Sequence, residues 1–371
     1  ILIAGNTAAG LVERNKKKWG NKLPHIIAEK QYYILGGNVT WVSGFWPGIL
    51  WLTYEMTGKK CFREYAEEFL EGFYERIVQR IAVDNHDMGF IYSPSCVAAY
   101  KLTGNEKAKE TALLAADLLC ERFIEKGRFL NAWSDMSEAK AENNFYIIDC
   151  LLNIPLLYWA SEVSGKNRYS EIAEMHLTTT MDTIIREDGS TYHSFYFDIE
   201  TGEKVGGKTQ QGYGDESTWS RGQAWAILGF ALNYMTTKQH KRTLECFKRC
   251  TDFFIRHLPA DHVPYWDFHF KCGNQPKDSS AAAIAICGIM EMYKNLPDDT
   301  DVRRYASEAG RMLASLIGHY AANTDTKTDG LLFNGTGSVP HNLSIGEPLI
   351  FGDYFYMEAI VRALKSWERY W

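Results

Sequence analysis

The sequence lacks any pattern of paired cysteines that predicts a disulfide framework or a zinc site. Its eight cysteines are scattered along 371 residues, and only Cys246 and Cys250 lie close together, one helical turn apart. Neither a CxxC pair nor an HExxH motif occurs, so we expect no structural zinc and no zincin chemistry. The sequence therefore predicts neither a metal nor another cofactor. Unpaired thiols are typical of a reducing compartment, which predicts a cytoplasmic protein.

Long apolar runs are also missing. No stretch of about 18 apolar residues occurs, so no segment is expected to span a membrane. The first five residues, Ile1 to Gly5, form too short an apolar stretch for a signal peptide. The chain does not begin with Met, which favours trimming at the N-terminus.

An excess of basic charge is absent as well. Lys and Arg number 40 against 46 Asp and Glu, which gives a formal net charge of −6. Nucleic acid and anionic lipid both require a concentrated basic surface, so neither is expected as the main partner.

Aromatic residues are abundant, with 11 Trp, 21 Tyr and 19 Phe. A hydrophobic fraction of 46% argues against disorder and is enough for a large core, which we expect to hold most of these rings. Tryptophans in loops with Gly and Pro are a different case, because flat indole faces stack on sugar rings.

A unit of two helices recurs along the chain. In each unit an apolar helix ends in a small polar turn and is followed by an amphipathic helix rich in Lys, Glu and Tyr. The spacing of about 45 to 75 residues is expected for helix pairs that carry additional loop segments. The turns lie at 56–58, 102–104, 163–165, 235–237 and 295–297.

The two helices of a unit differ in how they expose apolar residues. Phe62, Tyr65, Phe69 and Phe73 form one stripe beside a charged face, whereas the segment 281–286 is apolar all round and must be buried. The apolar helices therefore predict an inner ring and the amphipathic helices an outer one.

The two ends of the chain complete the ring. Residues 354–360 supply a sixth inner helix, and the N-terminal stretch 11–20 is its expected outer partner. We predict an all-α fold, an (α/α)6 six-hairpin barrel, formed by a single catalytic domain over residues 1–371.

The segments that lead into inner helices concentrate Trp, His, Asp and Arg. All inner helices of such a barrel run in the same direction, so these segments meet at one end, where we expect the active site. Helix N-termini there would favour an anionic substrate such as a uronate. The segments are 41–46, 86–90, 133–149, 215–225, 264–267 and 352–354.

Two carboxylates are the candidate catalysts. We expect Asp149 to lie one turn into an otherwise apolar helix that includes residues 145–152, where burial raises the pKa of an acid and lets it donate a proton. Asp87, between His86 and Gly89, is the second candidate. The alternatives are an Asp149 satisfied by a Tyr or an amide, and an Asp87 that caps a helix.

His193 and Arg221 are polar candidates. His193 lies in a loop, where a histidine is more often a surface turn residue than a catalyst. Arg221 stands between Trp219 and Trp225 in an acidic and aromatic segment, which suits a ligand platform. Its alternative is a buried Arg–Asp pair that fixes the start of a helix.

Four motifs together resemble the unsaturated glucuronyl hydrolases, glycoside hydrolase family 88. They are HDMGF at 86–90, IDCLLNIPLLYWA at 148–160, STWSRGQAW at 217–225 and GDYF at 352–355. The resemblance runs from about Lys30 to the C-terminus, and the family has the six-hairpin barrel that the repeats predict.

The resemblance implies an unusual glycosidase reaction. The substrate is an oligosaccharide that a lyase has left with a C4=C5 double bond in its terminal glucuronic acid. An acid protonates C4, water adds at C5, and the hemiketal opens and expels the remaining saccharide. Rules that relate carboxylate separation to retention or inversion do not apply to this hydration.

The resemblance also implies roles for individual residues. Asp149 is similar to the general acid and base of the family, and Asp87 to the second essential Asp, which holds ring hydroxyls. His193 and Gln211 match positions that face the reacting sugar. The matching aromatic walls and polar contacts are Trp41, Trp133, Trp219 and Trp225, with Arg221 and His86.

One loop departs from the pattern of members that prefer sulfated fragments, which carry serines and a lysine before the last inner helix. Residues 334–349 contain Ser338, His341 and Ser344 but neither Lys nor Arg. We therefore expect unsulfated or weakly sulfated chondroitin- or hyaluronan-type disaccharides as substrates.

Three other functions fit the same motifs less well. The first is an unsaturated rhamnogalacturonyl hydrolase that acts on pectin fragments. The second is an ordinary glycosidase of the same architecture that cleaves saturated oligosaccharides. The third is a non-catalytic sugar-binding α/α barrel, which fold analogy alone does not separate from an enzyme.

Overall fold

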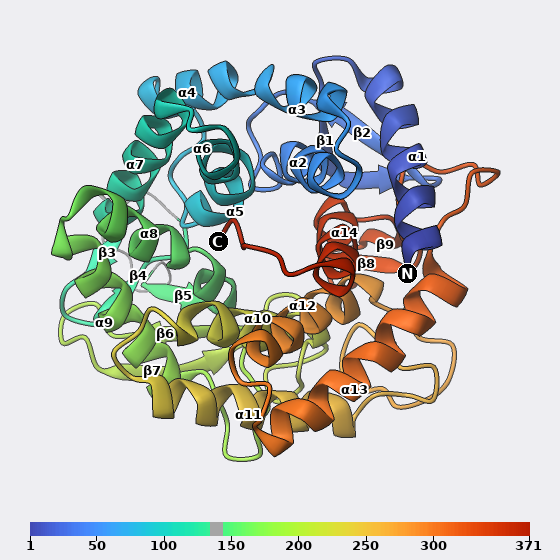
Figure 1. The fold of residues 1–371 in the computed structure, drawn as a ribbon. Helices are drawn as coiled ribbons and strands as arrows, with labels where there is room; N and C mark the ends of the chain where they lie inside the picture. The colour runs from blue at the N-terminus through green and yellow to red at the C-terminus, as the bar shows by residue number, and fades with distance from the viewer. Residues whose placement is uncertain (134–143) are drawn as a thin grey trace.

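The helices form two concentric rings (Figure 1) in a computed structural model that describes residues 1–133 and 144–371. The inner helices are α2 (Phe45–Thr57), α5 (Met88–Tyr92) with α6 (Ala98–Thr103), α8 (Pro155–Ser164), α10 (Ser220–Tyr234), α12 (Ser279–Asn295) and α14 (Ile350–Leu364). The outer helices are α1 (Leu2–Trp19), α3 (Lys60–Glu67) with α4 (Leu70–Val78), α7 (Glu106–Glu121), α9 (Asn167–Thr183), α11 (His240–Arg256) and α13 (Thr300–Ser315). The predicted (α/α)6 barrel is confirmed, and α1 closes the ring against α14 and α2.

Small apolar residues let the inner helices pack closely. The side chains of 281–286 in α12 are fully buried, as their uniform hydrophobicity predicts. Gly288 faces α10, where an added Cβ would lie 2.6 Å from the Cα of Leu228. The contact between these two helices therefore requires glycine at this position.

Glycines in the left-handed conformation end three of the inner helices. Gly58, Gly104 and Gly165 have φ values of 70°, 71° and 72° and follow α2, α6 and α8 directly. Glycine adopts this conformation without a steric penalty, and its N–H caps a carbonyl of the last turn. These glycines confirm three of the predicted turns.

Short antiparallel strands decorate the loops. The pairs are β1 (Leu23–Glu29) with β2 (Tyr32–Gly36), β3 (Phe123–Ile124) with β4 (Phe129–Leu130), and β8 (Gly335–Ser338) with β9 (Leu343–Glu347). A sheet of three joins β5 (Phe145–Ile147), β6 (Ser194–Phe197) and β7 (Lys204–Lys208). The β8–β9 pair forms a short hairpin within 334–349.

The prediction of a helix over 145–152 is wrong. Phe145 to Ile147 form β5, which pairs with β6, and Ile148 to Leu152 form a 3₁₀ helix. The inner helix α8 begins only at Pro155, because proline lacks the N–H that a helix interior requires and fits the first helical turn.

The C-terminal tail crosses the ring and covers the end of the barrel opposite the inner-helix N-termini. After α14 the chain runs towards the centre of the ring, where the C-terminus lies (Figure 1). The ring of Trp371 stacks on Phe355 with centroids 5.8 Å apart, and its indole N–H donates to Glu358 at 3.0 Å. The indole N–H of Trp367 donates to Glu55 at 2.7 Å.

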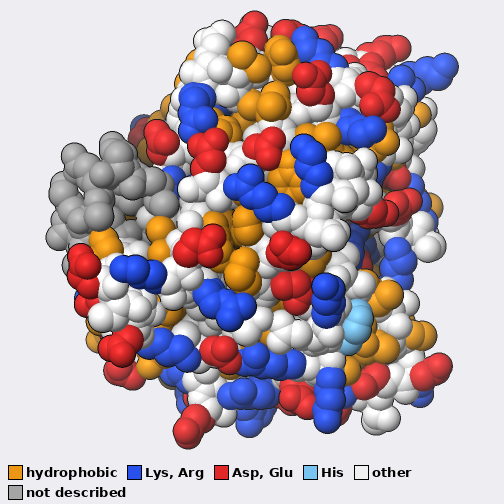
Figure 2. Space-filling view, turned by 90° about the vertical axis from the view of Figure 1, so that its left-hand side faces the viewer, with side chains coloured by type: hydrophobic (Ala, Val, Ile, Leu, Met, Phe, Trp, Pro, Cys, Tyr) orange, Lys and Arg blue, Asp and Glu red, His pale blue; other side chains and the backbone are white. Residues whose placement is uncertain are grey.

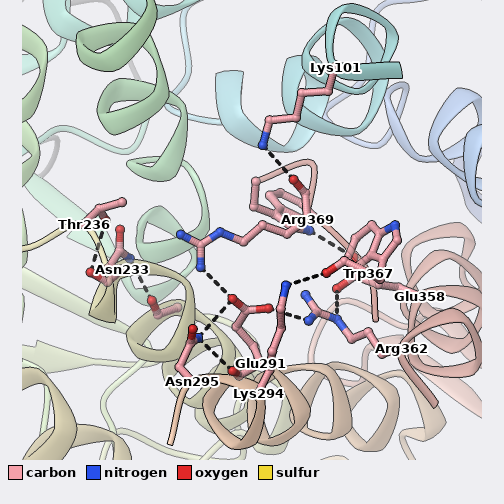
Figure 3. Close-up of polar contacts among 12 residues, drawn as sticks. Lys101, Asn233, Thr236, Glu291, Lys294, Asn295, Glu358, Arg362, Trp367 and Arg369 are labelled. Atoms are coloured by element: carbon pink, nitrogen blue, oxygen red, sulfur yellow. Dashed lines mark hydrogen bonds and ion pairs between the residues drawn. The ribbon is translucent and has the colours of Figure 1, made fainter. Parts of the chain in front are cut away.

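A buried ionic network fixes this tail (Figure 3). Arg362 of α14 donates to Glu358 at 2.8 Å and to Glu291 of α12 at 2.5 Å, and Arg369 of the tail donates to Glu291 at 2.7 Å. The amino group of Lys294 donates to the carbonyl of Trp367 at 2.7 Å. The network borders a cavity of about 260 Å³ and ties two inner helices to the tail.

The surface carries both signs of charge. On the face drawn in Figure 2, Lys and Arg side chains alternate with Asp and Glu, so this face has no concentrated basic patch. Among the helices of residues 1–133 and 144–371, none combines the length and apolar character needed to cross a bilayer.

Candidate active site

The predicted site residues meet at the end of the barrel where the inner helices begin. A series of short contacts joins the segments that precede α2, α5, α8, α10 and α14. Residues 134–143, part of the predicted segment 133–149, lie outside the part of the chain that the structure describes.

Asp149 lies in the 3₁₀ turn between β5 and α8. The turn is fixed on one side by the N–H of Ile148, which donates to the carbonyl of His193 at 2.9 Å. The Asp149 side chain is about nine-tenths buried. Its Oδ2 atom is buried and has no hydrogen-bond partner among the described residues, so the alternative of an acid satisfied by a Tyr or amide does not hold for this oxygen.

Asp87 occupies the N-cap position of α5, as the alternative expects, but its side chain accepts no capping hydrogen bond. Its Oδ1 atom lies 3.4 Å from Nε2 of His86 instead. The N–H of Phe90 donates to Asn153 at 2.9 Å, and a Cβ on Gly89 would lie 2.4 Å from the Cα of Asn153. This close approach brings the two Asp-bearing segments together.

Both carboxyl groups have raised pKa values, so each keeps a large protonated fraction near neutral pH. Burial raises the pKa of Asp149 to about 7, although its own backbone N–H, the Arg221 guanidinium and the Trp225 indole oppose the shift. Burial and the charge of Asp149 raise the pKa of Asp87 to about 8, against the opposing charges of Arg76 and Arg122. The neutral form of an acid is the one that can donate a proton.

His193 is buried and faces Asp149, so the expectation of a surface turn residue is wrong. Its Nε2 atom lies 3.9 Å from Oδ2 of Asp149, and its Nδ1 accepts the N–H of Gln210 at 3.1 Å. Burial lowers the pKa of His193 to about 3, helped by the charge of Arg221. The ring is therefore neutral, and its centroid lies 4.6 Å from that of Trp219, with an angle of 46° between the planes.

Arg221 joins three segments of the site. Its guanidinium pairs with Asp278 at the start of α12 and donates to the carbonyls of Thr336 and Gly337 in β8. It also donates to Gln211 at 3.2 Å and lies 4.5 Å from the Trp219 ring. The predicted alternative of a buried Arg–Asp pair therefore holds, with Asp278 as the acid, while the contacts to Gln211 and Trp219 keep Arg221 at the site.

Aromatic rings form the walls. Trp41 contacts Phe90 at 5.3 Å and Phe351 at 5.2 Å, and the buried Trp225 contacts Phe90 at 5.2 Å. Trp133 is 37% exposed and lies 6.3 Å from the His86 ring. Trp133 therefore supplies an open face, whereas Trp225 supports the wall from behind.

Four residues near the site were not predicted from the sequence. Phe90 and Phe351 complete the aromatic wall. The available signal was their position beside a glycine in the first turn of an inner helix, since Phe90 follows Gly89 and Phe351 precedes Gly352. Arg76 and Arg122 are buried cations whose charges act on Asp87. Both lie in or directly after outer helices, and nothing in their spacing indicates this contact.

Replacing Asp149 by Asn is expected to stabilise the protein at alkaline pH. The folded chain keeps this group protonated up to about pH 7, whereas the unfolded chain ionises it near the ordinary value, so stability falls as pH rises between the two. Asn cannot ionise. We expect the Tm of D149N to exceed that of the wild type at about pH 8 and the difference to shrink at about pH 5.

The matched control for this measurement is D298N, since Asp298 is fully exposed. It should leave Tm unchanged at both pH values in thermal unfolding followed by circular dichroism. A D149N effect that is equal at both pH values would show that burial of the charge is not its cause.

Comparisons with known proteins agree with this geometry. An unsaturated chondroitin disaccharide hydrolase of Streptococcus pneumoniae is 44% identical over 343 residues, which cover 91% of this chain and 85% of that protein. The crystal structure of an unsaturated glucuronyl hydrolase from Streptococcus agalactiae matches with a TM-score of 0.95 and 41% identity, covering 100% of this chain and 94% of that one.

A mutant of the Streptococcus agalactiae enzyme in complex with dGlcA-GalNAc6S matches with a TM-score of 0.88 and 40% identity, covering 99% of this chain and 92% of that one. The sequence model of Glycosyl Hydrolase Family 88 matches residues 12–363. With almost the whole chain matched and the motifs of the barrel mouth in place, the protein belongs to glycosyl hydrolase family 88.

Proposed function

We propose that the protein removes unsaturated glucuronic acid from the non-reducing end of oligosaccharides that lyases release from chondroitin- or hyaluronan-type glycosaminoglycans. The observation that carries this proposal is the buried Asp149, whose pKa of about 7 lies beside that of Asp87, at about 8, within an aromatic wall. A vinyl ether needs a neutral acid as its proton donor, and Asp149 supplies one near neutral pH.

The reaction needs one proton donor that is later restored. Neutral Asp149 gives its proton to C4 of the unsaturated sugar, and the C4=C5 electron pair forms the new C–H bond. The resulting Asp149 carboxylate takes a proton from water as the water oxygen bonds to C5. That proton restores the neutral Asp149. The hemiketal then opens as the C5–O5 bond breaks and its O–H proton moves to the ring oxygen, and the hemiacetal left at C1 breaks down to an aldehyde as its proton passes to the oxygen of the departing saccharide.

The surrounding residues would hold the sugar, while burial favours the neutral form of Asp149. Asp87 would accept from ring hydroxyls, and the neutral His193, 3.9 Å from Asp149, would contact the reacting sugar. Trp41, Trp133 and Trp219 would flank the planar C4=C5 region. Arg221 already pairs with Asp278, so it acts chiefly by positioning Gln211 and Trp219.

A panel of lyase products tests the proposal. The protein is mixed with unsaturated disaccharides from chondroitin, hyaluronan and rhamnogalacturonan, and the ultraviolet absorbance of the C4=C5 bond is followed together with release of the partner sugar. Loss of absorbance with the glucuronyl substrates is the expected result. Turnover of the rhamnogalacturonan product alone, cleavage of saturated oligosaccharides, or binding without turnover would each replace the proposal by the corresponding alternative.

Unsulfated disaccharides are the expected best substrates. The hydroxyl of Ser338 is engaged with His341 at 2.8 Å, that of Ser344 accepts the N–H of Ala28 at 3.1 Å, and 334–349 contain no Lys or Arg. A sulfate there would lose water without gaining a cationic partner. We expect kcat/KM for unsulfated chondroitin disaccharide to exceed that for the 6-sulfated one by about tenfold.

Paired steady-state assays on the two disaccharides measure this ratio, and unsulfated hyaluronan disaccharide serves as the control for the sugar epimer. The Streptococcus agalactiae mutant was crystallised with a 6-sulfated disaccharide. The prediction therefore implies that this protein and that relative differ in their preference for 6-sulfated substrates. Equal or faster turnover of the 6-sulfated substrate would contradict it.

We also propose that the protein acts in the cytoplasm. All eight cysteines are free, and six of them, including Cys150 beside Asp149, are buried. Burial raises the pKa of the Cys150 thiol, so it stays protonated and unreactive. Such thiols are compatible with a reducing compartment.

A further inference from the structure

An exposed aromatic pair lies beside the site. Tyr213 is 58% exposed, and its ring stacks on that of His269 with centroids 4.3 Å apart and an angle of 16° between the planes. Phe270 contacts the same tyrosine ring edge-on at 5.2 Å, and Trp266 does so at 6.4 Å. His269 covers one face of the Tyr213 ring and Phe270 covers its edge. The second face of the ring is therefore the exposed one.

The pair is held rigidly by one buried carboxylate. Oδ2 of Asp267 accepts the N–H of Tyr213 at 2.9 Å and the hydroxyl of Ser217 at 2.7 Å, while Oδ1 accepts the N–H of His269 at 2.8 Å. Asp267 is fully buried, and its backbone pairs with Trp219 of the site. The two rings are thus fixed in place before any ligand arrives, which reduces the entropy cost of binding.

The pair stands next to the substrate-binding residues. Gln211, which accepts a hydrogen bond from Arg221, is two positions before Tyr213, so their Cα atoms are at most about 7 Å apart. The intervening Gly212 packs tightly, since a Cβ there would lie 2.6 Å from Oγ1 of Thr209. A saccharide that left the site past Gln211 would meet the open face of Tyr213.

We propose that Tyr213, backed by His269, forms a distal subsite that stacks on a pyranose ring beyond the first sugar after the scissile bond. A flat apolar face suits the C–H face of a pyranose and requires no charge, so it would accept hexosamine and uronate rings alike. The proposal rests on the proposed function and extends it. It implies that an oligosaccharide longer than a disaccharide gains one contact, with Tyr213, that the disaccharide lacks.

The test compares an unsaturated unsulfated chondroitin tetrasaccharide with the corresponding disaccharide. Only the tetrasaccharide carries pyranose rings beyond the first sugar after the scissile bond. In Y213A we expect the ratio of kcat/KM for the tetrasaccharide to kcat/KM for the disaccharide to fall about fivefold, as KM for the tetrasaccharide rises. Y213F keeps the ring and should keep the wild-type ratio.

Tyr293 provides a matched control, because it is 41% exposed and lies near the C-terminal end of α12, away from the site. Y293A should leave the ratio unchanged. An unchanged ratio in Y213A would overturn the proposal. Equal losses on both substrates would also overturn it, since Tyr213 would then act only by positioning the Gln211 loop.

Calorimetric binding separates this proposal from the proposed function. In the D149N background, the tetrasaccharide should bind more tightly than the disaccharide, and Y213A should abolish that difference. If the wild type turns over no unsaturated substrate but this binding difference persists, the proposed reaction fails while the distal subsite stands. If binding does not depend on Tyr213, the distal subsite fails whatever the activity.

Discussion

Replacing Asp149 by Asn is expected to lower kcat by about two to four orders of magnitude, the range that a positioned general acid contributes. Asn fills the same space but can neither donate a proton to C4 nor take one from water. Oδ2 of Asp149 lies 3.9 Å from Nε2 of the neutral His193, and the charge of Asp149 acts on the second carboxyl group of the site, Asp87. The measurement is the loss of C4=C5 absorbance under saturating substrate.

Two controls make the result specific to the chemistry. D149N should bind unsaturated disaccharide with an affinity close to that of the wild type in calorimetry, because the aromatic wall is intact. The variant D298N, which changes a fully exposed surface residue, should keep full activity. If D149N retained activity within about threefold of the wild type, Asp149 would not be the general acid.

Replacing Arg362 by Met is expected to destabilise the protein by about 3–5 kcal/mol, as for other broken buried ion pairs. The guanidinium is 4% exposed and bonds Glu358 at 2.8 Å and Glu291 at 2.5 Å, whose carboxylates would be left buried. Burial would raise the pKa of Glu291, yet Arg362 and Arg369 lower it to about 2, so it remains charged at all working pH values. Chemical unfolding followed by circular dichroism measures the change.

The exposed pair of Arg80 and Glu121 gives the matched control. Their side chains are 56% and 52% exposed, and R80M should cost less than about 1 kcal/mol. Glu291 keeps its pair with Arg369 in R362M, so adding E358Q removes the carboxylate that loses its cation and should restore much of the lost stability. Similar effects of R362M and R80M would show that the network does not fix the tail.

The barrel could be predicted because its signals are local. Stripes such as Phe62 to Phe73, all-apolar segments such as 281–286, and glycines at the predicted turns each report on one helix and its ends. The ring then follows from alternating buried and half-buried helices, without knowledge of any single long-range contact.

The sequence could not predict the interactions that join distant segments. The helix expected over 145–152 became a strand because Phe145 to Ile147 pair with Ser194 to Tyr196, about fifty residues later. The carboxylate that pairs with Arg221 belongs to Asp278, 57 positions later, and not to a residue of its own segment. The crossing of the tail beneath the barrel likewise depends on Glu55 and Glu291, which are far from it in sequence.

The site itself was predicted as a set of residues but not as a geometry. Asp87, Asp149, Trp219 and Arg221 lie in motifs that resemble one family, so their grouping follows from the motifs. That the side chain of Asp87 accepts no capping hydrogen bond from α5 depends on how tightly neighbouring segments pack, which spacing does not encode.

Proton transfer to C4 is the central step of the proposed reaction, and nuclear magnetic resonance in D₂O tests it most directly. The unsaturated chondroitin disaccharide is mixed with the protein, and the vinylic H4 signal is followed together with the signals of the released sugar. We predict that the H4 signal disappears at the rate at which the partner sugar is released and that deuterium appears at C4. Release of a uronate that retains the H4 signal would mean displacement at C1 and would contradict hydration.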